Sequence, residues 1–541
     1  VVRKYLNRIY YYMRNGHNGV NGDYLDAASD DALSVISSES DVYKLAIGRY
    51  SASNLINSDM IWSDPYLVIR RVNILLSGID VVPFNTTYTD ALGNTRRLNE
   101  SMKAEARFLR AYFYFELVKR YGGVPIIGDK VYELNENIEL PRSTFEQCIK
   151  YIVSELDDIK DDLRSLPLPD AAASAHVVNT QAAQALKIRV LLYAASPLFN
   201  EKPIESGNEL IGYASYDRER WKIAADAARN FINTYGTGDG AIMGLDDNFK
   251  NVFTNWYSNE HKEVIFFREN AMDKTVETAN GPLGLSGAKQ GNGRTNPTQN
   301  LVDAFLMKDG HFIKEGKYEY NEQLPYAQRD PRLEYTIIHN GSSWVNSTME
   351  TWQGGANNPL GSSYSLTSYY MRKFMGDFEA ANEYQDTQHN WVMFRYAEIL
   401  LNFAEAENEY LPTPSQAVYD AIIALRRRAG IEPGEKNLYG LTTNEQTHNL
   451  TQAEMRKVIQ NERRIELAFE EHRYWDIRRW RLAEQVYAQP IQGMYITKSQ
   501  TSTTYVPQSV LNVQWDNKRY FYPIPYSEVI KNKNMVQNPN W

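Results

Sequence analysis

The chain has 541 residues, of which 43% are hydrophobic and 23% charged, so its composition is that of a folded protein with room for two or three domains or one large one. A formal net charge of −9, without a basic patch interleaved with aromatic residues, argues against nucleic-acid binding. The single cysteine, Cys148, excludes an intramolecular disulfide, and no run of about 18 apolar residues is present to span a membrane as a helix.

The N-terminal region begins with a helical pattern. The chain starts at Val1 without a signal peptide, which indicates a trimmed start. The loop that follows carries carboxylate, guanidinium and amide groups beside an aromatic ring, a combination that suits sugar hydroxyls and the apolar face of a sugar. Its candidate ligand-binding residues are Asp30, Tyr43, Arg49 and Asn54.

An acidic cluster lies in the same early loop, at Asp23, Asp26, Asp30 and Asp31. Calcium is one interpretation, but the alternating spacing of a calcium loop is missing, so we favour helix caps and turns. The eight histidines are scattered and form neither HxxxH nor HExxH, so no metal site and no cofactor is predicted.

Four apolar stripes with helical spacing follow, up to about residue 235. The second of them is preceded by Ser143 with Glu146 three residues later, which predicts a capping box. The stripes lie at 104–118, 145–159, 182–198 and 221–231. Small residues recur on them where neighbouring helices would approach closely, so we predict a mainly α fold of divergent, tetratricopeptide-like helix pairs over residues 1–235.

Between 236 and 390 the pattern changes to a loop-rich insertion with short strands, predicted at Glu263–Arg268 and Glu334–His339. Gly281–Arg294 is interpreted as a flexible loop, because it lacks the strand and helix context of a phosphate loop. Long structureless stretches inside folded proteins usually carry function, so this insertion is the candidate ligand-binding region.

Large aromatic side chains in this insertion follow no helical or strand period. Trp344, Trp352 and Tyr364 lie among Gly, Ser and Asn, where a ring either plugs onto the scaffold or forms an exposed platform. We hypothesise a platform for at least one of the two tryptophans. Trp256 and Tyr257 are a second candidate pair, for which burial is the favoured interpretation.

Helical spacing returns over 391–490, with a last helix predicted from Gln452 to about Tyr487. Charged residues fall on or beside its apolar face, where they must be paired to be tolerated. We therefore predict a buried ion network in which Arg473 balances Glu462, Glu466 and Asp476. Residues 491–541, with four prolines, are predicted to be an extended tail over the scaffold.

Four blocks in the same order resemble the SusD/RagB family of outer-membrane nutrient-binding proteins. They are KAEARFLRAYFYFELVKRYGGVP at 103–125, NPTQNLVDAFLMKDG at 296–310, NERRIELAFEEHRYWDIRRW at 461–480 and YFYPIPYSEVIKNKNMVQNPNW at 520–541. The resemblance implies one SusD-like unit: a scaffold of four tetratricopeptide-like helix pairs, with the ligand site on loops outside them.

The resemblance also implies a function. It is that of a non-catalytic, surface-exposed lipoprotein of the outer membrane, anchored through an upstream lipidated cysteine, which captures oligosaccharide or polysaccharide. The implied partner is a SusC-like, TonB-dependent β-barrel transporter. The alternative is a RagB-like peptide-binding protein, and a third, weaker option is a glycosidase, although no catalytic constellation is found.

Overall fold

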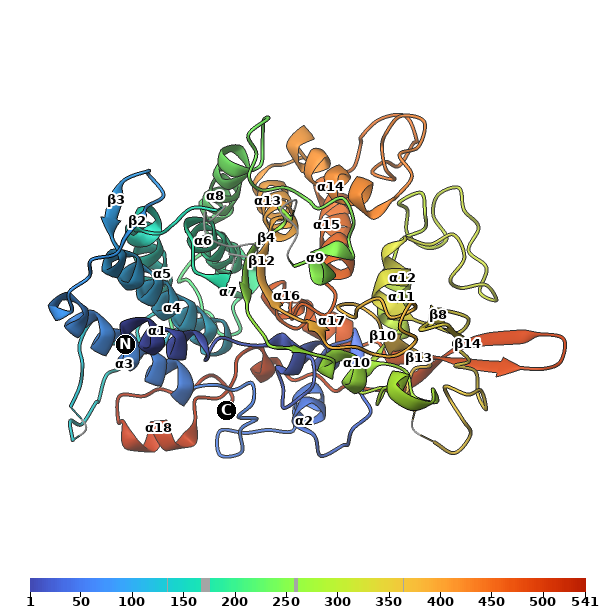
Figure 1. The fold of residues 1–541 in the computed structure, drawn as a ribbon, viewed down its shortest axis with the longest axis horizontal. Helices are drawn as coiled ribbons and strands as arrows, with labels where there is room; N and C mark the ends of the chain where they lie inside the picture. Colours follow the sequence, from blue (N-terminus) through green and yellow to red (C-terminus); the bar gives the residue numbers. More distant parts are fainter. Residues whose placement is uncertain (134, 167–175, 257–260, 363) are drawn as a thin grey trace.

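A series of helices packed side by side forms the scaffold of the protein. The structure, a computed structural model, describes residues 1–133, 135–166, 176–256, 261–362 and 364–541. Its scaffold helices form an arc from the left side of Figure 1, near the N-terminus, to its upper centre. They are α3 (Ser63–Gly78), α4 (Leu98–Tyr121), α5 (Phe145–Ile159), α6 (Thr180–Ala195), α8 (Glu219–Tyr235), α13 (Tyr396–Tyr410), α14 (Gln416–Ala429) and α15 (Gln452–Glu466).

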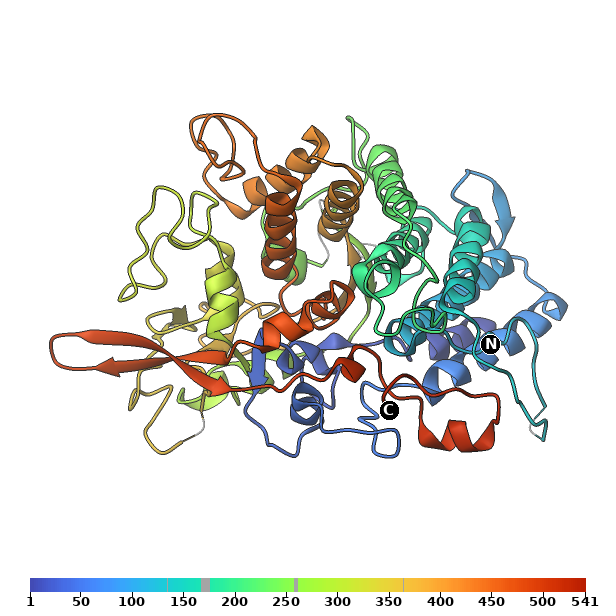
Figure 2. The ribbon, with the colours of Figure 1, turned by 180° about the vertical axis from the view of Figure 1, so that it is seen from behind.

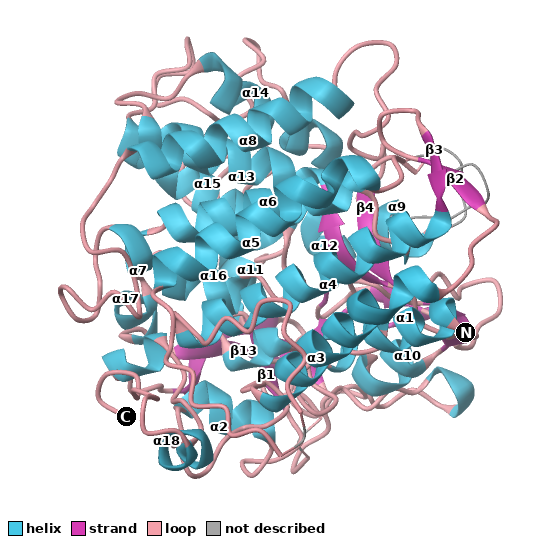
Figure 3. Cartoon of the chain, turned by 90° about the vertical axis from the view of Figure 1, so that its left-hand side faces the viewer, coloured by secondary structure: helices cyan, strands magenta, loops and turns pink. Residues whose placement is uncertain are grey.

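From α3 to α14 each scaffold helix packs against the next one in the series, and α13 also contacts α15. The side view in Figure 3 shows this stacking of helices. The prediction of a mainly α fold built from helix pairs is therefore confirmed. The predicted capping box exists one residue later than expected, between Thr144 and Gln147 of α5, because this pair satisfies the same spacing rule.

The long insertion leaves the scaffold after α8 and returns at α13, and these two helices pack against each other. The predicted strand near 263–268 is confirmed as β4 (Val264–Arg268). Only the end of the second predicted strand is extended, because α12 takes up residues 332–336. The insertion and its return contain α9 (Asn251–Thr254), β5 (Met272–Asp273), α10 (Thr275–Asn280), β6 (Thr295–Pro297), α11 (Gln299–Ala304), α12 (Arg332–Thr336), β7 (Ile337–Ile338), β8 (Ser343–Trp344), β9 (Ser347–Thr348), β10 (Tyr370–Met371), β11 (Thr387–Gln388) and β12 (Trp391–Arg395).

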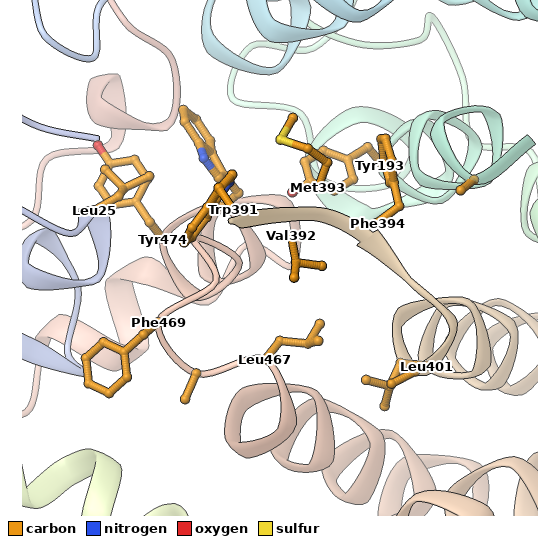
Figure 4. Packing of buried hydrophobic residues seen from close by; sticks show 14 of the residues in the cluster. Leu25, Tyr193, Trp391, Val392, Met393, Phe394, Leu401, Leu467, Phe469 and Tyr474 are labelled. Atoms are coloured by element: carbon orange, nitrogen blue, oxygen red, sulfur yellow. The ribbon is translucent and has the colours of Figure 1, made fainter. Parts of the chain in front are cut away.

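Strand β12 pairs antiparallel with β4 and runs through the centre of the core. Its side chains alternate: in Figure 4, Val392 points toward Leu467 and Met393 points to the opposite side. All residues of the strand are buried. A strand covered on both faces ties the two ends of the insertion to the scaffold, because burial on both sides fixes its register.

The remaining elements lie outside the scaffold helices and the insertion. At the N-terminus they are α1 (Val2–Tyr10), β1 (Ala32–Ser34), α2 (Asp41–Ile47), β2 (Thr87–Thr89) and β3 (Thr95–Arg97), with α7 (Pro197–Asn200) following α6. After α15 come α16 (Arg473–Arg479), α17 (Ala483–Tyr487), β13 (Ile491–Lys498), β14 (Thr503–Leu511) and α18 (Tyr526–Lys531). The last fifty residues thus contain a hairpin, β13–β14, which the sequence analysis did not predict and which projects from one end of the molecule (Figures 1 and 2).

The predicted continuous helix over 452–487 is wrong, because the chain breaks between α15 and α16. Phe469 and Glu471 have φ values of 63° and 62°, which end a right-handed helix. Asp26 accepts hydrogen bonds from the backbone N–H groups of both residues. Lys373 Nζ donates to two carbonyl oxygens in the break, one of them that of Glu466 at 3.0 Å. Buried polar side chains from distant segments therefore satisfy the backbone groups that the helix leaves without a partner.

Candidate functional site

Glu466, at the end of α15, is the centre of a buried ion network. Its side chain is 0% exposed and contacts the guanidinium groups of Arg332, Arg395 and Arg428. Arg332 Nη1 lies 2.9 Å from Oε2, and Arg395 Nη1 lies 2.7 Å from Oε1. Burial alone would raise the pKa of Glu466, but the three guanidinium groups hold this pKa well below its usual range. The carboxylate is therefore ionised inside the core.

The same network joins the insertion to the helices on either side of it. Arg332 belongs to α12 in the insertion and contacts Glu462 of α15 at 2.7 Å. Arg395, at the end of β12, contacts Glu263 beside β4 at 2.7 Å. Because each arginine binds two or more carboxylates, the planar guanidinium groups fix the geometry of the junction. The predicted buried network is thus confirmed, and it positions the candidate ligand-binding region.

Arg473 is not the residue that balances Glu462, Glu466 and Asp476, contrary to the prediction. Its Nε and Nη2 atoms instead lie 2.8 and 2.9 Å from the two carboxylate oxygens of Asp30 in the early loop. The prediction assumed an uninterrupted helix. The break between α15 and α16 turns Arg473 toward a partner that is 443 residues away in the chain.

The early loop is anchored through its acidic cluster. Asp30 is 5% exposed, and Arg464 also contacts it, at 2.8 Å. Burial would raise the pKa of Asp30, but the guanidinium groups of Arg464 and Arg473 lower it below its usual range. Asp23 likewise contacts Arg294 at 2.8 Å. Asp30 therefore holds the loop in place and is not accessible to a ligand, which corrects its assignment to the site.

His472 makes the stability of this region depend on pH. Burial, and then the neighbouring Arg463, lower the pKa of His472 well below its usual value. Below about pH 6.5 the unfolded chain therefore binds a proton at His472 that the folded chain does not, so stability falls as the pH falls. We expect His472→Gln to reduce the slope of the free energy of unfolding against pH by up to about 1.4 kcal/mol per pH unit between pH 6 and 4. Urea unfolding at several pH values measures the slope, and identical slopes for both proteins would contradict the assignment.

Two of the predicted aromatic residues are buried in the core and do not form a platform. Trp344 is 2% exposed, and its indole N–H donates to the Tyr384 hydroxyl at 2.9 Å. Trp256 is 3% exposed, and its indole N–H donates to the Gln388 carbonyl oxygen at 3.0 Å. Both rings are covered by distant parts of the insertion, so neither can stack on a ligand. Tyr257 lies outside the described residues.

Trp352 is partly exposed, in a turn-rich segment whose described residues are 350–362 and 364–366. Its ring is half-buried, and Lys498 Nζ of β13 lies 5.1 Å from the ring centroid. Lys498, which lies over the ring, is also 4.0 Å from Glu350, so a cation covers part of the ring and a carboxylate lies next to that cation. Leu360, in the same segment, is 75% exposed. We call this surface, formed by Glu350, Trp352, Leu360 and Lys498, the Trp352 platform.

The Gly-rich loop at 281–294 packs against this segment. It is held by defined backbone contacts, unlike the flexible loop that was predicted. The Gly293 N–H donates to the Gly281 carbonyl oxygen at 2.9 Å. Gly284 has a φ of +81°, and a Cβ atom there would lie 1.9 Å from the Ala356 carbonyl oxygen. Only glycine fits such a position, so the loop lets the 350–366 backbone approach closely.

Tyr364 lies on the side of this segment that meets the early loop. Strand β1 pairs with β6, and the Leu366 N–H donates to Asn296 Oδ1 of β6 at 2.8 Å. Ile36, two residues beyond β1, is 50% exposed, and Tyr364 is half-buried. The structure thus brings the early loop close to the segment that carries Tyr364, through β1–β6 pairing.

The other early-loop candidates stay at the surface. Tyr43 is half-buried on α2, and Arg49 and Asn54 are exposed. Arg49 contacts Glu39 at 2.9 Å, within its own loop. Their part in ligand binding stays a prediction.

Sequence reasoning missed the aliphatic and charged members of this surface. Leu360 and Leu366 are ordinary residues of a polar segment, and Lys498 belongs to the hairpin, which was not predicted. The only available signal was the alternation within 491–498, which is typical of a strand with one exposed face.

Two structural findings concern other kinds of site. Among the described residues, no cluster of three or more His, Cys, Asp or Glu side chains is arranged to hold a metal ion. No helix in the same part of the chain combines the length and the apolar character needed to cross a membrane.

Comparison with known proteins agrees with this architecture. Residues 262–541 match the family model described as the SusD family. Residues 2–192 match a second model, described as "starch-binding associating with outer membrane". The first match covers more than half of the chain and includes most of the insertion, the buried ion network and the C-terminal segment.

Individual relatives are similar over most of their length. SusD-like protein P2 of Formosa agariphila is 24% identical over 482 residues, covering 88% of this chain and 79% of that protein. SusD-like protein P25 of the same organism is 24% identical over 455 residues, covering 80% of this chain and 72% of that protein.

Solved structures share the fold. A SusD-like carbohydrate binding protein from Bacteroides fragilis superposes with a TM-score of 0.76 at 24% identity, over 99% of this chain and 98% of that one. A laminarin binding SusD-like protein gives 0.67 at 19% identity, over 100% and 99% of the two chains. With the family model matching from the insertion to the C-terminus, and with the helix-pair scaffold and its inserted loops in place, this chain belongs to the SusD family.

Proposed function

We propose that this protein is a non-catalytic glycan-binding protein that captures an oligosaccharide or polysaccharide on the Trp352 platform. The observation that carries the proposal is a large, partly exposed aromatic ring with a cation over it and a carboxylate 4.0 Å from that cation. An aromatic face stacks on the CH groups of a sugar ring, and the polar groups at its edge hydrogen-bond the hydroxyls. Tyr364 and the exposed aliphatic residues extend this surface toward the early loop.

Membership of the SusD family supports the partner and the location that we propose. The second family model associates starch binding with the outer membrane, and structural neighbours are named for carbohydrate or laminarin binding. We infer that the protein is a lipid-anchored lipoprotein at the cell surface. There it delivers its glycan to a SusC-like, TonB-dependent β-barrel transporter.

The absence of catalysis is also part of the proposal. The densest carboxylates of the chain, Glu462 and Glu466, are bound by buried arginines and are not open to a substrate. A glycosidase needs two carboxyl groups facing one sugar site, with the pKa of one of them raised so that it can donate a proton.

Binding of a panel of neutral polysaccharides and of a peptide pool, followed by assay for reducing ends, tests the function. We expect retention of at least one polysaccharide, no release of reducing ends and no retention of peptides. Trp352→Ala should weaken binding by about 2 kcal/mol, as for a stacking anchor, because the ring supplies the platform. Its melting temperature should stay near that of the wild type, since the ring is only half-buried.

Ala453, which is exposed on α15, provides a control site remote from the platform, and Ala453→Ser should change neither quantity. Full affinity in Trp352→Ala would place the site elsewhere. Retention of peptides alone would favour the RagB-like alternative. Release of reducing ends would show that the protein is a glycosidase.

A further inference from the structure

A second cleft, separate from the Trp352 platform, lies beside the N-terminal helix. It encloses about 540 Å³ between α1, the start of α4, the segment before α6 and the end of β4. Helix α1 packs against α4, with both elements visible near the N-terminus in Figure 3. The lining residues used below are Asn7, Tyr11, Arg164, Arg268 and Glu269.

Two arginines on this cleft lack the carboxylate partners that Arg332, Arg395 and Arg428 have in the core. Among the described residues, Arg268 Nε and Arg164 Nε are buried without a hydrogen-bond partner, and neither side chain forms an ion pair. Arg3, on the same cleft, instead contacts Glu105 at 2.6 Å. A desolvated guanidinium group without an anion is costly, so these two donors favour a negatively charged partner.

The charge on the lining agrees with this preference. Arg3, Arg164 and Arg268 line the cleft, against one carboxylate, that of Glu269, which is exposed. Burial lowers the pKa of Arg268, as expected for a cation with no anion close by. An anion bound here would relieve that cost without displacing an existing ion pair.

An accessible aromatic ring lies at the edge of the cleft. Tyr11, the residue after α1, is 76% exposed, and the Arg268 guanidinium carbon lies 5.7 Å from the centre of its ring. The side chains of Asn7 and Glu269 add an amide and a carboxylate on the same lining. A free inorganic anion would need neither the ring nor these groups, whereas a sugar uses all of them.

We propose that this cleft binds an acidic sugar residue, a pyranose that carries a carboxylate or a sulfate ester. Arg164 and Arg268 bind the anionic group through their guanidinium groups, and Tyr11 stacks on the sugar ring. Asn7 and Glu269 hydrogen-bond the hydroxyls. The inference rests on the proposed function in that the ligand is a saccharide, but it concerns a different surface and a charged class of glycan.

Isothermal titration of the purified chain tests the cleft with four probes. They are a disaccharide containing a uronic acid, the same disaccharide with its carboxyl group reduced to an alcohol, a sulfated form of the reduced disaccharide, and inorganic sulfate. We expect at least one of the two acidic disaccharides to bind at least tenfold more tightly than the reduced form, and the stronger of the two identifies the anionic group. Inorganic sulfate should bind at least tenfold more weakly than that disaccharide.

Arg164→Ala and Arg268→Ala should each weaken binding of the acidic disaccharide at least tenfold. Tyr11→Ala should also weaken it without a change in melting temperature, because this ring is exposed, so the test survives if an arginine variant fails to fold. Arg8→Ala, an exposed arginine on α1, is the matched control and should bind as the wild type does. Trp352→Ala should likewise leave this binding unchanged, which separates the cleft from the Trp352 platform.

Unchanged affinity of the acidic disaccharides in both Arg164→Ala and Arg268→Ala would overturn the proposal, as would equal affinity for the acidic and reduced disaccharides. Tight binding of inorganic sulfate alone would also overturn it, since the sugar would then have no role. None of these results tests the binding of neutral glycans at the Trp352 platform. The proposed function is tested separately, by the affinity of Trp352→Ala for a neutral glycan.

Discussion

Glu466→Gln should lower the free energy of unfolding by about 3–5 kcal/mol, the range for breaking a buried charge pair by removing one partner. Glutamine keeps the shape of the side chain but not its charge, and Arg332, Arg395 and Arg428 all contact this carboxylate. With the charge removed, three buried guanidinium groups would compete for the remaining carboxylates, Asp330, Glu462, Glu263 and Glu470. The loss should exceed that of any single exposed ion pair, for which about 0–1 kcal/mol is usual.

Urea unfolding of wild type and variant, followed by circular dichroism, measures this difference. Glu435→Gln, at an exposed turn, is the control and should change stability by no more than about 0.5 kcal/mol. If Glu466→Gln is no less stable than this control, the network is solvated and does not hold the insertion on the scaffold.

Trp344→Ala should be destabilising by about 3–5 kcal/mol, because it removes a large ring from a well-packed core. It should leave the glycan affinity of the folded protein close to that of the wild type, since the ring is not accessible. Trp344→Phe keeps most of the buried surface and loses the hydrogen bond to Tyr384. It should cost less than the alanine variant, by at least 1 kcal/mol.

Thermal melting together with titration of the glycan separates the two tryptophans. Trp344→Ala should lose stability and keep affinity, whereas Trp352→Ala should lose affinity and keep stability. The opposite pattern, with weak binding and full stability in Trp344→Ala, would show that Trp344 belongs to the ligand-binding site.

The scaffold was predictable because its signals are local. The spacing of apolar residues in 145–159 and the small residues along α6 depend only on neighbours within a few turns. The capping box was found one residue from its predicted place for the same reason. By contrast, the break after α15 depends on Asp26 and Lys373, which lie far from it in the chain, so no periodicity could reveal it.

The candidate site was predictable only as a region. Trp344 and Trp352 are eight residues apart in the same kind of polar segment, yet one is buried and the other accessible. The difference comes from distant residues that contact Trp344: its indole N–H donates to Tyr384, and Arg372 lies over its ring. Composition identified aromatic candidates, but burial is decided by contacts between segments that the pattern of residues does not connect.

The place at which the insertion leaves and re-enters the scaffold has a consequence for divergence within the family. Helices α8 and α13 pack directly against each other, so the two ends of the insertion are held together whatever lies between them. The entropic cost of closing a loop rises only slowly with its length, by about 0.6 kcal/mol for each doubling. Lengthening, shortening or exchanging turns such as 350–366 therefore costs the helices little, and new ligand preferences can arise by loop replacement while the supporting architecture is inherited unchanged.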